Sequence, residues 1–219
     1  MKTKILTILS NSDGYVSGQQ LCEQLGVSRT AVWKVINRLK EEGYLIDSVS
    51  NKGYRLLSQP DVVTSEAILS KLQTNYMGRQ VFSYDEVTST NTVAKQLADE
   101  GKEEGTLIVS DKQIQGKGRR GRYWESPKGS GIFMTVILKP KMKPVYASML
   151  TLVAALALND AITDLTGLEA KIKWPNDVVV NKKKVAGILT ELSAEVDYIN
   201  YIVVGIGVNV SLSLIHISE

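Results

Sequence analysis

Histidine and cysteine are almost absent from this 219-residue chain, which contains one of each, His216 and Cys22. A single cysteine excludes an internal disulfide framework and is typical of a reducing compartment. The same shortage argues against Cys/His nucleophilic catalysis and against a metal site made of these residue types. We therefore assign no metal ligand from the sequence.

Long apolar runs are also missing. No stretch of about 18 residues is apolar throughout, which predicts that no segment spans a membrane. The N-terminal sequence MKTKILTILSNSDGYVSG is basic and then apolar, but its apolar part is too short for a signal peptide and no small-residue cleavage site follows. These features predict a soluble, cytoplasmic protein.

An excess of charge of one sign occurs only in the first quarter of the chain. Residues 1–59 contain eight Lys or Arg and five Asp or Glu, whereas residues 60–219 contain eighteen of each. A basic surplus in one segment is expected where that segment meets a polyanion, although a surplus of three is small.

Residues 1–58 are predicted to form a winged helix-turn-helix domain. Apolar residues at helical spacing indicate helices at 4–10, 18–25 and 29–42, with Gly26 and Ser28 in the turn between the last two. Two extended runs around Asn51–Gly53 indicate a β-hairpin, the wing. The alternative is a small helical cap that packs on the rest of the protein.

The third helix of such a domain would enter the major groove of DNA with its N-terminal residues nearest the bases. Together with a lysine of the wing, the candidate DNA-binding residues are Ser28, Arg29, Thr30, Trp33, Lys34 and Lys52.

Residues 59–66, polar and containing a proline, are predicted to be a linker, and residues 67–210 a larger α+β domain with a mixed or antiparallel sheet. Helices are indicated at 65–74, 90–101 and 146–167. Strands are indicated at 81–87, 106–111, 131–140 and 198–210, with two more around an Asn-Lys turn in 171–192.

The segment GKGRRGRYW, Gly116–Trp124, matches the pattern G-x-G-x-x-G of dinucleotide-binding turns. Such a turn must open a helix, but here a proline-containing loop and a predicted strand follow, so that interpretation fails. Residues 112–128 contain six Lys or Arg and one acidic residue. Glycines allow close backbone approach and arginines pair with phosphate. A nucleotide, a nucleic acid or only solvent could face this loop.

Without reactive histidine or cysteine, a suitable reaction begins with a group that is nucleophilic at neutral pH, such as a carboxylate. Attack of a carboxylate on the α-phosphate of ATP mainly needs alignment and cations that offset charge. The basic glycine-rich loop can supply both.

Five motifs, in this order, resemble those of the biotin protein ligases: TSTN (Thr88–Asn91), GKGRRGRYW, KWPND (Lys173–Asp177), KKVAGIL (Lys183–Leu189) and GIGVN (Gly205–Asn209). With a winged helix before them, the chain resembles the bifunctional type, which is both ligase and repressor of biotin genes. The resemblance covers residues 3–210. It implies a winged helix-turn-helix domain followed by a mixed-sheet catalytic domain of the biotin/lipoate-ligase type.

The resemblance also implies an activity and partners. This family uses ATP and Mg²⁺ to convert biotin to biotinyl-5′-AMP, and then transfers biotin to a lysine of a biotin carboxyl carrier protein, as in acetyl-CoA carboxylase. A bifunctional member loaded with the adenylate forms a homodimer and binds operator DNA.

Site residues follow from the matching motifs. The resemblance assigns catalytic roles to Lys184, Arg119 and Asp177. It implies that the biotin-binding residues are Ser89, Thr90, Asn91, Gln113, Lys117, Gly118, Arg119 and Lys184. It places the adenylate on Gly116, Arg120, Arg122, Trp124, Asn176 and Asn209.

The chain departs from the family pattern in two places. Lys117 stands where the family usually has arginine, which a backbone role would tolerate and a bidentate role would not. Family members continue past GIGVN into a small C-terminal β domain, whereas residues 211–219 form an atypical tail, so we expect a truncated chain. A catalytically impaired biotin-sensing regulator and a lipoate or octanoate ligase are the alternative functions.

Overall fold

The computed structural model describes residues 1–60 and 63–211. The chain divides into two compact units, Met1–Gln73 and Thr74–Glu219, and each is described by itself. The atypical tail predicted at 211–219 lies, apart from its first residue, outside the described residues. The domain limits predicted from the sequence stay predictions.

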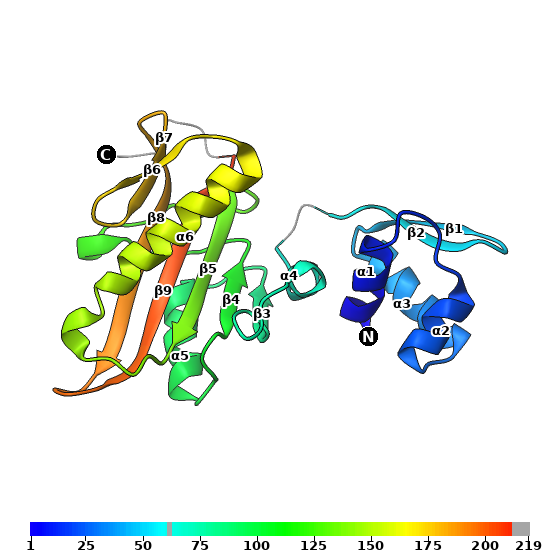
Figure 1. Ribbon diagram of the computed structural model, residues 1–219, viewed down its shortest axis with the longest axis horizontal. Coiled ribbons are helices and arrows are strands. Elements are labelled where there is room, and N and C mark those ends of the chain that lie inside the picture. The colour runs from blue at the N-terminus through cyan, green and yellow to red at the C-terminus, as the bar shows by residue number, and fades with distance from the viewer. Residues whose placement is uncertain (61–62, 212–219) are drawn as a thin grey trace. The chain divides into compact units, whose positions relative to one another are not determined.

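The first unit contains three helices, a hairpin and a fourth helix (Figure 1). These elements are α1 (Lys2–Ser10), α2 (Gly18–Leu25), α3 (Arg29–Glu41), β1 (Leu45–Val49), β2 (Gly53–Ser58) and α4 (Ser65–Lys71). Ser17 caps α2 in a capping box, and Gly26 ends that helix in the left-handed conformation, which glycine adopts without steric cost. Ser28 accepts a hydrogen bond from the Ala31 amide at the start of α3. The three helices and the hairpin expected from the sequence are confirmed.

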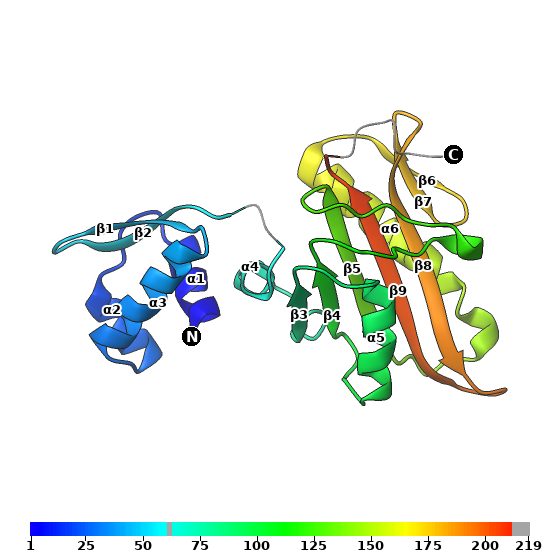
Figure 2. The same cartoon turned by 180° about the vertical axis from the view of Figure 1, so that it is seen from behind.

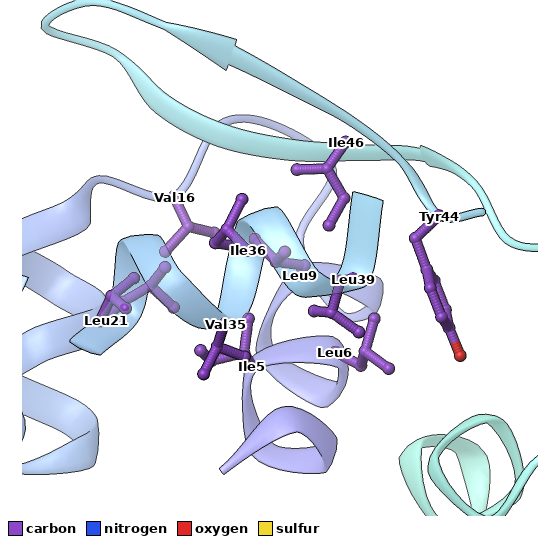
Figure 3. Packing of buried hydrophobic residues seen from close by; sticks show 11 residues of the cluster. Ile5, Leu6, Leu9, Val16, Leu21, Val35, Ile36, Leu39, Tyr44 and Ile46 are labelled. Carbon is purple, nitrogen blue, oxygen red and sulfur yellow. The ribbon is translucent and has the colours of Figure 1, made fainter. Parts of the chain in front are cut away.

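One face of α3 lies in the core of this unit, as Figure 3 shows. Ile36 and Leu39 pack there with Ile5 and Leu6 of α1 and Leu21 of α2. Cys22 packs against the same cluster. The opposite face of α3 is left to solvent.

Replacement of Ile36, which is 1% exposed, tests this core. Ile36→Ala should lower the free energy of unfolding of this unit by about 2–5 kcal/mol, because it leaves a cavity. Trp33→Ala, on the exposed face of the same helix, is the matched control and should change it by less than about 0.5 kcal/mol. Denaturant unfolding followed by circular dichroism would measure both, and equal effects would contradict the packing.

The second unit is built on a seven-stranded mixed sheet in the order β3-β4-β5-β9-β8-β7-β6. β3 and β4 are parallel, and the other neighbours are antiparallel. The strands are β3 (Val81–Tyr84), β4 (Leu107–Ser110), β5 (Gly131–Leu138), β6 (Ala170–Lys173), β7 (Asp177–Val180), β8 (Lys183–Ala194) and β9 (Ile199–Asn209). Two short 3₁₀ turns, η1 (Arg119–Gly121) and η2 (Pro144–Tyr146), lie in the connections.

Two helices cover opposite faces of the sheet (Figures 1 and 2). α6 (Met149–Thr166) lies on one face, and α5 (Thr90–Asp99) lies on the other, seen toward the viewer in Figure 2. Ala155 and Leu158 of α6 pack against Val178 and Ile188, whereas Ala94 and Leu97 of α5 pack against Ile108. The α+β class with a mixed sheet is confirmed.

The segment Pro144–Thr166 is long and apolar enough to cross a membrane by length and composition alone, although we expected no such stretch. Ala155, fully buried, and Leu158 place one side of this helix in the sheet core. The outer side exposes Leu152, Val153 and Leu156. We interpret α6 as the helix that covers this sheet, since it contacts β6, β7, β8 and β9.

The sequence pattern predicts two strands in 171–192, whereas the structure has three, because residues Ala170–Lys173 form β6. This strand is four residues long and mostly exposed, so it lacks the alternation of buried residues that reveals a strand. Its pairing with β7 decides its conformation. The predicted Asn-Lys turn is present, with Asn181 and Lys182 both at positive φ, as in the tight turns typical of hairpins.

Candidate active site

A pocket on the α5 side of the sheet brings together residues that are distant in the chain, from Ser89 to Gly207. Most of the predicted ligand-binding residues line it: Ser89, Thr90, Asn91, Gln113, Lys117, Gly118, Arg119, Trp124, Asn176 and Lys184. Backbone and side chains of β8 and β9 complete the wall: Gly187, Ile188, Leu189, Gly205, Ile206 and Gly207. The structure therefore brings these ten predicted residues together around one pocket.

The start of α5 supplies polar groups to this pocket. Thr90 donates to Oε1 of Gln113 through both its backbone amide (2.8 Å) and its hydroxyl (3.1 Å). Nε2 of Gln113 donates to Oγ of Ser126 (2.9 Å), which in turn donates to the carbonyl of Trp124 (3.1 Å). Ser89 is the N-cap residue of α5, but its side chain makes no capping hydrogen bond, although it is 2% exposed. Its hydroxyl thus remains available to a ligand.

The segment GKGRRGRYW forms a short hairpin. Lys117 and Tyr123 form a bridge, the Gly118 amide donates to the Arg122 carbonyl (2.8 Å), and Arg120 at the tip has a φ of 57°. No helix follows it, which agrees with the rejection of a dinucleotide-binding turn. Nζ of Lys117 donates to Oγ1 of Thr92 (3.0 Å), a contact that needs no forked side chain.

Trp124 lies on a surface made by two glycines. A Cβ atom at Gly207 would come within 2.6 Å of its indole ring, and one at Gly187 within 2.8 Å. Nζ of Lys184 is 5.0 Å from the centre of the Trp124 ring, on its face, at a distance where cation–π attraction operates. The two glycines therefore let the indole approach the strands and place Lys184 above it.

Lys184 also forms an ion pair with Asp177, with 2.8 Å between Nζ and Oδ1. The two side chains are 30% and 20% exposed, so water still reaches the pair. Nearby, Nη1 of Arg119 donates to Oδ1 of Asn176 (3.1 Å), whose Nδ2 donates to the Ile188 carbonyl (3.0 Å). Two cationic side chains thus stand at one wall of the pocket, each held by a residue of KWPND.

Four of the predicted adenylate-binding residues do not line this pocket. Arg120 lines a second hollow, formed with the start of α6 and Trp174, which shares Arg119, Asn176, Ile188 and Leu189 with the first. Arg122 is exposed, and a Cβ at Gly116 would collide with the Trp124 carbonyl. Oδ1 of Asn209 is buried without a hydrogen-bond partner among the described residues.

The sequence assignment missed two polar residues behind the pocket wall. Thr135 of β5 and Glu191 of β8 hydrogen bond to Asn91. Gly187, within KKVAGIL, and Gly205 and Gly207, within GIGVN, provide close backbone approach; glycine inside a strand is the signal for this. Nothing in the local sequence marks Thr135 or Glu191.

Glu191 combines burial with strong hydrogen bonding. Burial by itself raises the pKa of its carboxyl, but hydrogen bonds from Lys95 and Asn91, with the charges of Lys95 and Lys117, hold the pKa below its ordinary value. The carboxylate is therefore ionised at neutral pH.

In the first unit the predicted DNA-binding residues lie on the exposed face of α3 and on the hairpin. Trp33 is 55% exposed. Ser28, Arg29, Thr30, Lys34 and Lys52 are exposed as well. Two of these residues on α3, Arg29 and Lys34, are cationic, and the hairpin carries a third cation, Lys52.

Comparison with known proteins agrees with both units. Residues 83–209 match the biotin/lipoate A/B protein ligase family, and residues 2–55 match an HTH domain. The chain is 43% identical over 197 residues to the bifunctional ligase/repressor BirA of Bacillus subtilis, an alignment that covers 90% of this chain and 61% of that protein. For the protein of the same description from Escherichia coli, the identity is 32%, with 95% of this chain and 63% of that protein covered. The chain thus spans about three fifths of these curated relatives.

Solved structures give the same result. The biotin protein ligase of Aquifex aeolicus in complex with biotin and ATP has a TM-score of 0.51 at 33% identity, over 64% of this chain and 56% of that one. The biotin protein ligase of Leishmania major in complex with biotin has a TM-score of 0.52 at 29% identity, over 61% and 57% of the two chains. Since the match in sequence covers more than half of the residues and includes the pocket, this chain belongs to the biotin/lipoate A/B protein ligase family.

Proposed function

We propose that the second unit binds biotin and ATP and joins them to biotinyl-5′-AMP. The observation that carries this proposal is the single pocket that gathers Ser89, Gln113, Lys184 and the basic hairpin. Its buried hydroxyl and amide groups suit a small polar ring system, and its cationic wall suits a carboxylate next to a phosphate.

The first half-reaction is an in-line displacement. A carboxylate oxygen of biotin attacks the α-phosphorus of ATP, the new C–O–P linkage forms, and the bond to the β-phosphate oxygen breaks to release pyrophosphate. Lys184 and Arg119 would offset the negative charge of the biotin carboxylate and the α-phosphate. Before the ligands bind, Asp177 holds Lys184 and Asn176 holds Arg119 in position. Trp124, whose ring lies under Nζ of Lys184, would pack against the ligand.

Mg²⁺ fits this site as an ion carried by the nucleotide. Among residues 1–60 and 63–211, no group of three or more Asp, Glu, His or Cys side chains is arranged to hold a metal. Mg²⁺ commonly binds through one or two carboxylates and the substrate phosphates, so Asp177 is the residue here that could contribute. The ion would neutralise the phosphates during displacement.

In the second half-reaction, the amine of an acceptor lysine would attack the acyl carbon of the adenylate and displace AMP. The second hollow shares four lining residues with the first, so a lysine presented there could reach the adenylate. We propose a biotin carboxyl carrier domain as the acceptor, in the cytoplasm.

The test is biotin- and ATP-dependent release of pyrophosphate by this chain, with mass spectrometry of the bound small molecule and lipoate and octanoate as competing acids. We expect biotinyl-5′-AMP. Adenylate formed only from lipoate or octanoate would assign another acid to this pocket. Binding of biotin without any adenylate would support a sensor without catalysis.

The first unit supports a second role, the repression of biotin genes through operator DNA. Its exposed face on α3 carries Arg29, Lys34 and an unpacked Trp33, and the wing carries Lys52. We propose that the adenylate-loaded chain acts as a homodimer, as two copies would match the two halves of an operator.

The exposed cations of α3 give a measurable expectation. Lys34→Ala should weaken DNA binding to all sequences about equally and reduce the salt dependence by about one ion, because it removes one phosphate contact. Arg29→Ala should also weaken binding. Fluorescence anisotropy with a labelled duplex at several salt concentrations would measure this, with Lys71→Ala of α4 as a control of equal charge change. Equal losses in all three variants would remove the assignment to α3.

A further inference from the structure

A carboxylate behind the pocket ties two turns of α5 to β8. Oε2 of Glu191 accepts from Nδ2 of Asn91 (2.8 Å), and Oε1 accepts from Nζ of Lys95 (2.8 Å). Asn91 is 3% exposed, whereas the Glu191 and Lys95 side chains are 27% and 33% exposed. The inner half of this contact therefore lies in the protein interior and the outer half meets solvent.

The carboxylate fixes which way the Asn91 amide points. Nδ2 of Asn91 donates to Glu191 and also to the Leu189 carbonyl (3.2 Å), and both of these partners can only accept. The reversed amide would set its oxygen against two acceptors. Oδ1 of Asn91 therefore faces Thr135, which lies 2.7 Å away.

This direction continues through the floor of the pocket. The Thr135 hydroxyl is within hydrogen-bond distance of Oδ1 of Asn91 and of Oγ1 of Thr90 (2.8 Å), but it has one proton to donate. The Thr90 hydroxyl donates onward to Gln113, whose amide is oriented by Ser126. One acceptor at Asn91 or Thr90 thus stays without a donor among the described residues, and both residues line the pocket.

We infer that Glu191 is a positioning residue, which sets the donor and acceptor pattern that the pocket presents to the ureido ring of biotin. The inference rests on the proposed function. A ureido group has two N–H donors and one carbonyl acceptor, so its binding depends on which pocket groups donate and which accept. Glu191 acts through Asn91 and Thr135 and does not itself line the pocket.

Glu191→Gln tests this with little change in shape. The glutamine amide can donate as well as accept, so it removes one of the two acceptors that oppose a reversed Asn91 amide, and we expect the dissociation constant for biotin to rise about tenfold. Lys95→Met is the matched control, because it removes the other partner of the same carboxylate while the contact with Asn91 stays. It should leave biotin affinity within about twofold. Calorimetric titration of biotin, without ATP, measures the affinity, and thermal melting reports the fold.

The outcomes are separable. Failure of the unaltered chain to bind biotin would overturn the proposed function itself. If the unaltered chain binds biotin and Glu191→Gln binds it with unchanged affinity, only the role of Glu191 is overturned. Equal losses of affinity in Glu191→Gln and Lys95→Met would also overturn that role, because they indicate an ion pair that merely stabilises the fold. A rise in KM for biotin with an unchanged KM for ATP would support it. If Glu191→Gln does not fold, Glu191→Asp, which can still only accept, should retain affinity within about threefold, and loss of binding there would overturn the inference.

Discussion

Lys184→Met should reduce biotin- and ATP-dependent release of pyrophosphate by about 10²–10³-fold, the usual cost of removing one group that stabilises developing charge. Nζ of Lys184 lies between the face of Trp124 and the carboxylate of Asp177, at the wall of the pocket. Methionine keeps most of the length of the side chain and removes the charge. A coupled assay for pyrophosphate under saturating biotin and ATP would measure the effect.

The neighbouring lysine provides the control. Lys183 precedes Lys184 on β8, is exposed, and does not line the pocket. Lys183→Met should leave turnover within about twofold. If both variants, or neither, lose activity, Lys184 does not have the role that its position indicates, and the charge of the whole turn, or another cation such as Arg119, would have to explain the reaction.

Gly205→Ala should both destabilise the second unit and abolish binding at the proposed biotin site. The added Cβ would collide with Oδ1 of Asn91. Asn91 cannot move aside, because it is buried and its amide is held by Leu189, Glu191 and Thr135. Overpacking of this kind costs about 1–3 kcal/mol, and any shift of Asn91 disturbs the floor of the pocket.

Denaturant unfolding and titration with biotin would measure the two effects of Gly205→Ala. Gly14→Ala is the control, since a Cβ there meets nothing within 4 Å and its backbone is not left-handed. We expect it to change neither quantity. A Gly205→Ala variant that bound biotin with unchanged affinity would show that Asn91 can be displaced without consequence, which would also weaken the inference about Glu191.

Much of the fold can be predicted from local sequence. Ser17, Ser28 and Gly26 mark helix ends through their own hydrogen bonds and backbone freedom. The buried positions of α3 recur at helical spacing. β6 could not be found in this way, because its four residues carry no alternation and only the pairing with β7 makes them a strand.

The candidate site divides in a similar way. The family resemblance pointed to Ser89, Gln113, Arg119 and Lys184, and the structure places all four around one pocket. Nothing in the sequence separates Arg120 and Arg122 from these four residues. Their separation follows from the hairpin, which places Arg120 at its tip and in the second hollow.

By itself, the sequence determined the two-part organisation and the exposed basic face of α3, because both depend on patterns within short segments, and its family resemblance supplied the candidate ligand-binding residues. Tertiary structure alone decided why Gly205 must lack a side chain and that Glu191 orients Asn91 from 100 residues away. These features depend on contacts across β8, β9 and α5, and such contacts exist only after the sheet has brought distant segments together.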